Sequence, residues 1–253
     1  MRIGAALGLG ILIAASGIQG GESPDPQPAV VVVDAGHGGA DYGARGLDDL
    51  LEKDVTLDVA QHLGWALERA GYTVVYTRGS DRFVSLVERT EIANRAEGSL
   101  FVSLHGNASS DPEVGGIETY FLSKDATDEE ALRLAEVENA YLQESRVFPG
   151  SESIVGNILQ DLVWTAHLER SSRLASEIQR RLARLPGPSR GVRQAPFVVL
   201  MGVNMPAVLV EIGFLTHPVE GRRLREKPYL RAIATALGEA VRAYQEKEEE
   251  GPR

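Results

Sequence analysis

The stretch over residues 30–39 constrains the fold of this chain more than any other. Four consecutive valines, Val30–Val33, are typical of a strand buried on both faces, as in the centre of an α/β sheet. The strand leads into a turn in which glycines flank His37 on both sides, so the backbone can turn sharply and another group can approach the ring. Ligands of open α/β sheets bind beyond the carboxyl ends of the strands. We therefore expect His37 to lie at a site.

Two further apolar runs end in a similar way. Residues 100–104 predict a buried strand that leads into His105, and residues 207–213 predict a third buried strand that carries Glu211 near its carboxyl end. The carboxyl ends of parallel strands meet at one edge of a sheet. These side chains are therefore expected at the same edge as His37.

Helical and strand patterns alternate along the whole chain, which favours one α/β domain. We expect a mixed, mostly parallel twisted sheet with helices on both faces, and 253 residues suffice for one sizeable core. Further strands are predicted by short apolar runs over residues 72–76, 117–122 and 197–200. Helices are predicted by apolar residues at helical spacing over residues 55–70, 86–94, 154–185 and 228–244. Residues 247–253 are expected to form a charged, solvated tail.

Composition excludes several classes of function and of site. The formal net charge is -10 and no basic stripe is evident, which argues against a nucleic-acid partner. The chain has no cysteine, so any metal ion must be bound by His, Asp or Glu.

The first residues have the features of an export signal. Arg2 precedes an apolar or small run over residues 3–18, and small side chains at 14–16 offer a cleavage site. We expect a signal peptide over 1–20 and a proline-containing linker over 21–29, hence an exported, periplasmic protein. The alternative is an uncleaved anchor, but the run is short for a membrane span of about 20 residues. We therefore expect no stable membrane insertion of the mature chain.

The titratable residues at the strand ends could form a metal centre. Glu52 precedes a predicted helix and could simply stabilise its amino terminus. Two imidazoles and one carboxylate are, however, the usual ligands of a catalytic zinc ion, and a further glutamate can transfer protons. The residues alone leave open whether Glu52 or Glu211 binds the metal. Each could also be an ordinary polar group with its hydrogen bonds satisfied.

The remaining histidines are expected to be non-ligands. His62 falls on the polar face of a predicted helix, His167 lies within a helix, and His217 precedes a proline in a turn. Two rival enzyme classes are not supported, because their motifs are absent. The sequence has no His-Glu-x-x-His run, which would mark the helix of a metallopeptidase, and Ser103 lacks the elbow turn of a serine hydrolase. A catalytically silent binding module would lack a metal ligand or a base.

Residues 124–152 form a charged insert with its own helical pattern. Its apolar stripe comprises Ala131, Leu134, Ala135, Tyr141 and Leu142. Glu138 falls in the middle of this stripe, and a carboxylate on a buried face is costly unless it is paired or bound to a cation.

Five segments in order resemble the zinc-dependent N-acetylmuramoyl-L-alanine amidases of the amidase type 3 family. They are residues 33–39, 52–54, 77–94, 103–108 and 209–214. The resemblance implies a catalytic domain over residues 30–246 that includes the insert.

The resemblance also implies roles for individual residues. It implies that His37, Glu52 and His105 hold one Zn²⁺ ion and that Glu211 is the catalytic acid/base. The implied substrate is peptidoglycan, cut at the amide between N-acetylmuramic acid and L-alanine. Asn107 is a weaker candidate for orienting the substrate. Arg78 and Arg89 could do the same, although tying the loops at the strand ends together is the stronger interpretation.

The insert resembles the regulatory segment of the cell-division amidases. That resemblance implies autoinhibition, with Glu138 in the open zinc position and an activator protein of the LytM type that withdraws the helix. The enzyme would then act in cell-wall remodelling and daughter-cell separation. The alternative is a mobile lid on which Glu138 contacts only solvent.

Overall fold

The computed structural model describes residues 28–140 and 154–251, with side chains from residue 167 onward in the second range. The expected signal peptide lies outside the described residues, as do most of the expected linker and two residues of the insert stripe, Tyr141 and Leu142. Within the described ranges, no helix combines the length and the apolar composition that crossing a membrane requires.

Six strands form one sheet in the order β2-β1-β3-β6-β4-β5. Their bounds are β1 Val30–Ala35, β2 Thr73–Tyr76, β3 Leu100–Asn107, β4 Ile117–Leu122, β5 Ser189–Ala195 and β6 Ala207–Phe214. All neighbouring strands pair in parallel except β4 and β6, which are antiparallel. The expected mixed, mostly parallel sheet is therefore confirmed.

Helices occupy every connection between consecutive strands except that from β3 to β4, and two more helices follow the last strand. Their bounds are α1 Glu52–Arg69, α2 Leu86–Arg95, α3 Glu129–Asn139, α4 Ile154–Leu182, α5 Val198–Met201, α6 Glu220–Arg223 and α7 Lys227–Glu250, with a 3-10 turn η1 at Leu47–Asp49. Local chemistry sets several ends. Ser85 caps α2 by accepting from the Glu88 N–H, and Asp128 caps α3 by accepting from the Ala131 N–H. Gly71, with φ of 92°, follows α1 where a left-handed residue ends a helix.

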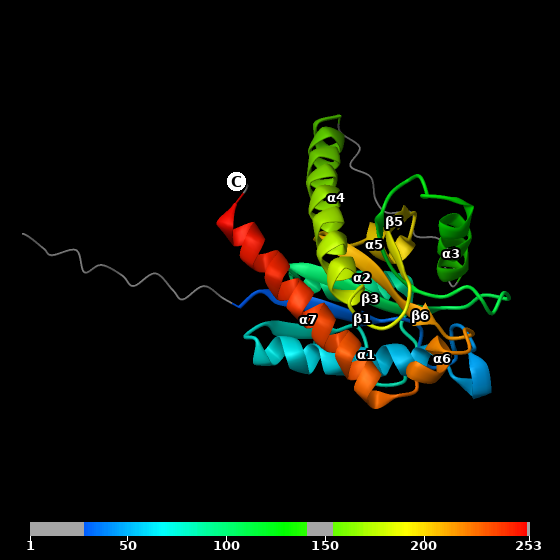
Figure 1. Ribbon diagram of the computed structural model, residues 1–253. Helices are drawn as coiled ribbons and strands as arrows, with labels where there is room; N and C mark the ends of the chain where they lie inside the picture. Colours follow the sequence, from blue (N-terminus) through cyan, green and yellow to red (C-terminus); the bar gives the residue numbers. More distant parts are fainter. Residues whose placement is uncertain (1–27, 141–153, 252–253) are drawn as a thin grey trace, which may run out of the picture.

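The helices cover both faces of the sheet (Figure 1), as expected. Helices α1, α4 and α7 share one core with Val31 and Val33 of β1, whereas Val32 belongs to the core on the face of α3 and α5. All three valines are fully buried, and each contributes roughly 1.5–3 kcal/mol relative to exposure. The valine run thus reflects a central strand that is covered on both sides.

Two details of the sequence prediction were wrong. The apolar run 197–200 is not a strand: Phe197 precedes the single helical turn α5, and its ring packs edge-on against Tyr120 with centroids 5.1 Å apart. The sixth strand is instead β5, which was not predicted because it contains few apolar residues. As an edge strand, β5 carries arginines whose charges are paired by carboxylates of neighbouring elements.

The charged tail expected over 247–253 also differs from the structure. Helix α7 continues to Glu250, and its last turns pair with α4. Lys247 Nζ lies 2.9 Å from Glu177 Oε2, and Glu248 Oε2 lies 2.9 Å from Arg170 Nε. The charges that suggested a solvated tail therefore join two helices.

Strand direction brings the ends of four strands to one edge of the sheet. The carboxyl ends of β1, β3 and β6 meet there, and the reversed β4 contributes its amino end. In the strand register, Glu211 of β6 lies between His105 of β3 and Glu118 of β4. Helix α3 stands over this edge (Figure 1).

Candidate metal centre

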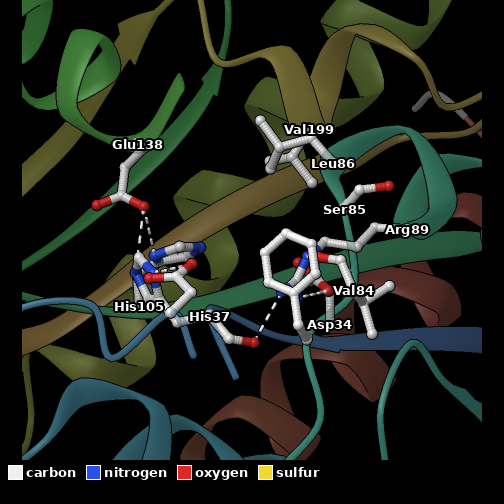
Figure 2. A pocket seen from close by; sticks show the side chains of 11 residues that line it. Asp34, His37, Val84, Ser85, Leu86, Arg89, His105, Glu138 and Val199 are labelled. Atoms are coloured by element: carbon white, nitrogen blue, oxygen red, sulfur yellow. Dashed lines mark hydrogen bonds and ion pairs between the residues drawn. The ribbon is translucent and has the colours of Figure 1, made fainter. Parts of the chain in front are cut away.

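Four side chains from four elements converge at this edge. His37 follows β1, Glu52 is the first residue of α1, His105 belongs to β3, and Glu138 lies in the last turn of α3. One donor atom of each lies within 4.8 Å of all the others. Figure 2 shows Glu138 pointing from its helix toward His37 and His105.

The contacts within this cluster leave one nitrogen without a hydrogen bond. His37 Nε2 lies 3.0 Å from Glu52 Oε1 and 3.4 Å from Glu138 Oε2, yet it has no hydrogen-bond partner among the described residues. His105 Nδ1 lies 3.1 Å and 2.9 Å from the same two carboxylates. The donor atoms therefore point at a shared position, and two imidazoles with carboxylates match the ligands that Zn²⁺ prefers.

Groups behind the cluster hold its members in place. Asp41 Oδ2 lies 2.9 Å from His37 Nδ1, which leaves Nε2 facing the cluster. Glu52 accepts hydrogen bonds from the N–H groups of Ala44 at 2.7 Å and Gly106 at 2.9 Å. The sequence analysis missed the role of Asp41, although a carboxylate four residues from a turn histidine was an available signal.

The glycine-rich loop is required by close approach. A Cβ atom at Gly36 would lie 2.6 Å from His105 Cε1, and one at Gly43 would lie 2.5 Å from Glu52 Oε2. His37 itself adopts φ of 59°, a left-handed conformation that is rare for residues other than glycine. Such strain is typical of functional sites, where the surrounding structure enforces it.

Opposite charges shift the ionisation of the cluster. Burial disfavours the imidazolium form, but the surrounding carboxylates outweigh burial and raise the pKa of His37, and they raise that of His105 to about 10. Burial likewise opposes the charge on Glu52, yet His37 and His105 lower its pKa. The cluster thus favours negative carboxylates around a positive centre.

Helix α3 carries Glu138 into the site as the insert pattern predicted. Ala131 and Ala135 of the stripe are buried, and only 10% of the Glu138 side chain is exposed. Asn139 fastens this end of the helix, because its amide donates to the Pro196 carbonyl and accepts from the Val198 N–H, both at 2.9 Å. The alternative of a lid with Glu138 in solvent disagrees with these contacts.

Glu211 lies next to the cluster, fully buried on β6. Neither carboxylate oxygen has a hydrogen-bond partner among the described residues. Burial, reinforced by the nearby Glu52 and Glu138 carboxylates, raises its pKa well above the ordinary value. Such a group is suited to holding and transferring a proton at neutral pH.

A cavity of about 520 Å³ opens beside the cluster. It is lined by His37 and Glu52 on the sheet side and by Glu130 and Glu138 on the α3 side. A much smaller hollow, about 20 Å³, lies between His37 and Phe83. The larger cavity is wide enough for part of a peptide or sugar.

Comparison with protein families identifies the catalytic unit. The family model described as N-acetylmuramoyl-L-alanine amidase matches residues 31–243. The chain belongs to this amidase family. The resemblance noted in the sequence is thereby confirmed, and with it a peptidoglycan-hydrolysing activity at the level of the family.

Curated relatives carry the same name. The chain is 36% identical over 218 residues to the amidase AmiA of Escherichia coli, an alignment covering 85% of this chain and 75% of AmiA. It is 33% identical to AmiC of Neisseria meningitidis over 89% of this chain, where it spans about half (55%) of the relative.

Solved structures of amidases have the same fold. AmiC2 of Nostoc punctiforme has a TM-score of 0.66 and 30% identity, covering 87% of this chain and 98% of that chain. An amidase from Clostridium difficile 630 has a TM-score of 0.67 and 26% identity, covering 88% and 100%. Zinc dependence is general in this family, and the His/Glu cluster of this chain could bind a metal ion.

The other candidate residues of this amidase lie around the cluster. Asn107 lines the large cavity and donates to Glu118 Oε1 at 3.1 Å. Arg78 and Arg89 are buried and donate to backbone carbonyls of the His37 loop, including Gly36 at 2.8 Å and His37 at 2.8 Å. Both arginines thus tie the loop in place.

The three remaining histidines lie outside the cluster. His62 pairs with Asp58 at 3.5 Å on α1, His167 lies on α4, and His217 Nδ1 accepts from the N–H groups that begin α6. The other rival group, Ser103, donates to the buried Asp34 at 2.7 Å and so takes a structural role.

Proposed function

We propose that this chain is a zinc-dependent hydrolase of the amide bond between N-acetylmuramic acid and L-alanine in peptidoglycan. The observation that supports it most is the convergence of two imidazoles and a carboxylate on one position, with His37 Nε2 buried and without a hydrogen bond. The substrate class follows from the amidase family to which the chain belongs.

His37, Glu52 and His105 would hold one zinc ion. Bound zinc supplies a Lewis acid that polarises the scissile carbonyl and acidifies water. Asp41 keeps the His37 ring oriented, and the Ala44 and Gly106 amides fix the Glu52 carboxylate. These contacts organise the site before substrate arrives, which limits reorganisation during the reaction.

Glu211 acts as the proton carrier in this proposal. Its carboxylate takes a proton from the attacking water and delivers it to the amide nitrogen as the carbon–nitrogen bond breaks. Its burial and the lack of competing hydrogen bonds suit a group that must exchange protons with water and substrate. Asn107, at the wall of the large cavity, orients the substrate.

Helix α3 inhibits the enzyme while it covers the metal cluster. Glu138 reaches within 2.9 Å of His105 and 3.4 Å of His37, so its carboxylate would compete with water and substrate for a zinc ion held by these residues. Activity then requires withdrawal of α3, which is a two-state displacement. An activator of the LytM type would supply the energy by binding the withdrawn state.

The cellular role follows from the substrate and the expected signal peptide. Peptidoglycan lies outside the inner membrane, so we infer export over residues 1–20 and action in the periplasm on the cell wall. A self-inhibited amidase that needs an activator suits daughter-cell separation, where cleavage must be confined in place and time. If the protein shows no hydrolysis, the second candidate function is that of a wall-binding module without catalysis.

The test is hydrolysis of purified peptidoglycan sacculi by the mature protein, with the released fragments identified by mass spectrometry. Wild type, Glu138→Ala and the double variant Glu138→Ala/Glu211→Gln are compared, each with chelator and with zinc restored. We expect peptides that begin with L-alanine, released faster by Glu138→Ala than by wild type, abolished by chelator and absent with the double variant. Cleavage at another bond, or equal rates for Glu138→Ala and the double variant, would overturn the proposal.

A further inference from the structure

A second charged cluster lies beside the large cavity, which one of its members, Glu130, lines. Two arginines of β5, Arg190 and Arg193, share the buried carboxylate of Glu118 on β4. Arg193 Nη1 lies 2.8 Å and Arg190 Nε 3.1 Å from Glu118 Oε2. Arg190 also stacks on Phe214, which lines the cavity, at 5.4 Å from the ring centroid.

Helix α3 supplies the remaining negative charges of this cluster. Glu130 Oε2 lies 2.5 Å from Arg190 Nη2 and 3.2 Å from Arg193 Nη1, and Asp128 pairs with Arg193. Glu118 is fully buried, whereas Glu130 and Asp128 are 41% and 48% exposed. The sheet carboxylate is therefore fixed, and the helix carboxylates are the ones that can leave.

Charge balance shows what withdrawal of α3 would create. With the helix in place, the two guanidinium groups face three carboxylates. Without it, they face Glu118 alone, which leaves one uncompensated positive charge in a partly buried position at the cavity. Such a charge is costly unless another anion replaces the lost partners.

We propose that Arg190 and Arg193 form a subsite for a carboxylate of the peptide substrate, and that Glu130 occupies this subsite while α3 covers the site. The inference rests on the proposed amidase function. Helix α3 then resembles a bound acidic peptide at two points: Glu130 lies at the arginine pair and Glu138 at the metal ligands. The planar guanidinium group of arginine can donate two parallel hydrogen bonds to one carboxylate, which makes its binding of carboxylates more directional than that of other side chains.

Helix geometry places the substrate carboxylate. Glu130 and Glu138 are eight residues apart, a rise of about 12 Å along α3. An extended peptide spans about 3.3–3.6 Å per residue. The subsite should therefore bind a carboxylate that lies three to four residues from the amide bond that is cut.

The test measures binding first, so that it does not depend on catalysis. Chelator-treated Glu138→Ala protein is titrated calorimetrically with a muramoyl tetrapeptide that ends in a free carboxylate and with its C-terminal amide. We expect the acid to bind about ten-fold more tightly than the amide, because charge-assisted hydrogen bonds to the arginines are lost in the amide.

Three second-site variants in the Glu138→Ala background separate the subsite from a merely structural cluster. Glu130→Gln removes the competing carboxylate and should tighten binding of the acid several-fold. Arg190→Gln should abolish the preference for acid over amide. Glu129→Gln, an equal charge loss at an exposed position of the same helix, should leave both affinities unchanged.

The subsite would be overturned if Glu130→Gln bound the acid peptide more weakly than, or as tightly as, the Glu138→Ala parent. It would also be overturned if Arg190→Gln still bound the acid more tightly than the amide. If Arg190→Gln does not fold, as judged by thermal unfolding, Glu130→Gln alone decides. Hydrolysis of the same peptide with zinc restored is scored separately. Loss of hydrolysis with the binding pattern intact refutes the amidase proposal, whereas hydrolysis without that pattern refutes the subsite.

Discussion

Glu211 has the most unusual environment of the described carboxyl groups near the metal cluster. It is fully buried, its oxygens accept no hydrogen bond from described residues, and its pKa is raised by burial. A carboxyl group in such surroundings lowers stability at neutral pH while it serves proton transfer. Trade-offs of this kind between stability and activity are common at active sites.

Replacing this carboxyl group should therefore stabilise the fold and abolish activity. Because the folded pKa lies above the unfolded value, the native state retains a proton that the unfolded chain releases, and wild-type stability falls as pH rises above about 4.5. Glu211→Gln removes this pH-dependent loss. We expect a gain of roughly 1–3 kcal/mol at pH 8 in urea unfolding of the metal-free protein, with the gain vanishing near pH 4.

Glu118→Gln is the matched control on the neighbouring strand. Glu118 is equally buried but is paired with Arg190 and Arg193, so its loss should destabilise the protein by roughly 3–5 kcal/mol. If both variants changed stability in the same direction, the account of Glu211 as an unpaired buried acid would fail.

The two imidazoles of the cluster should make zinc binding depend on pH. The pKa of His105 is raised to about 10 and that of His37 is also raised, so both rings are protonated in the metal-free protein at pH 7. Metal ligation needs neutral imidazole, so zinc should displace about two protons, and its affinity should increase with pH from 6 to 9. Calorimetry in buffers of different ionisation enthalpy measures this release. Zinc binding without proton release would contradict the assignment.

At the scale of elements, the proposed autoinhibition depends on how α3 is attached. Its carboxyl end is fastened by Asn139 to the segment between β5 and α5, and its amino end is fastened by the arginines of β5. Between these attachments, α3 buries the small side chains of Ala131 and Ala135 in the core on its face of the sheet. A helix that buries such small apolar side chains and is otherwise held by polar contacts can be released without unfolding the sheet.

Loosening one attachment should therefore raise basal activity. Asn139→Ala removes two hydrogen bonds, worth about 0.5–1.5 kcal/mol each, and so favours the withdrawn state. Together they amount to about 1–3 kcal/mol, so we expect basal sacculus hydrolysis to increase by at least about five-fold, but less than in Glu138→Ala. Glu136→Ala, at an exposed position of the same helix, is the control and should behave as wild type. An unchanged rate in Asn139→Ala would show that this contact does not restrain α3.

The parts of the fold that the sequence predicted are those with strong apolar patterns. Strands β1, β3 and β6 are continuous buried runs; His37 follows the first of them, and His105 and Glu211 lie near the carboxyl ends of the other two. Strand β5 was missed because it contains few apolar residues and its arginines pair with carboxylates distant in sequence, which no local periodicity reveals. The Glu118 cluster was missed because its partners are set by tertiary contacts, whereas Asp41 lies only four residues from His37 and its contact was open to prediction.

At the scale of the whole molecule, the sheet brings distant residues to one point. Four parallel strands and the reversed pair β4 and β5 place the ends of β1, β3, β4 and β6 together, and the helices cover this arrangement on both faces (Figure 1). Helix α3 of the insert covers this edge (Figure 1). The proposed catalysis and its proposed restraint would thus rest on one sheet and one helix that can detach from it.

The zinc environment tests this account most directly. X-ray absorption at the zinc edge on the zinc-loaded protein should show one ion with two imidazole nitrogens and carboxylate oxygens at about 2.0–2.2 Å. In Glu138→Ala, one carboxylate contact should be replaced by water, with both imidazoles retained. Identical zinc environments in the two proteins, or an ion without two imidazole ligands, would contradict the claim that Glu138 blocks a His37–Glu52–His105 zinc centre.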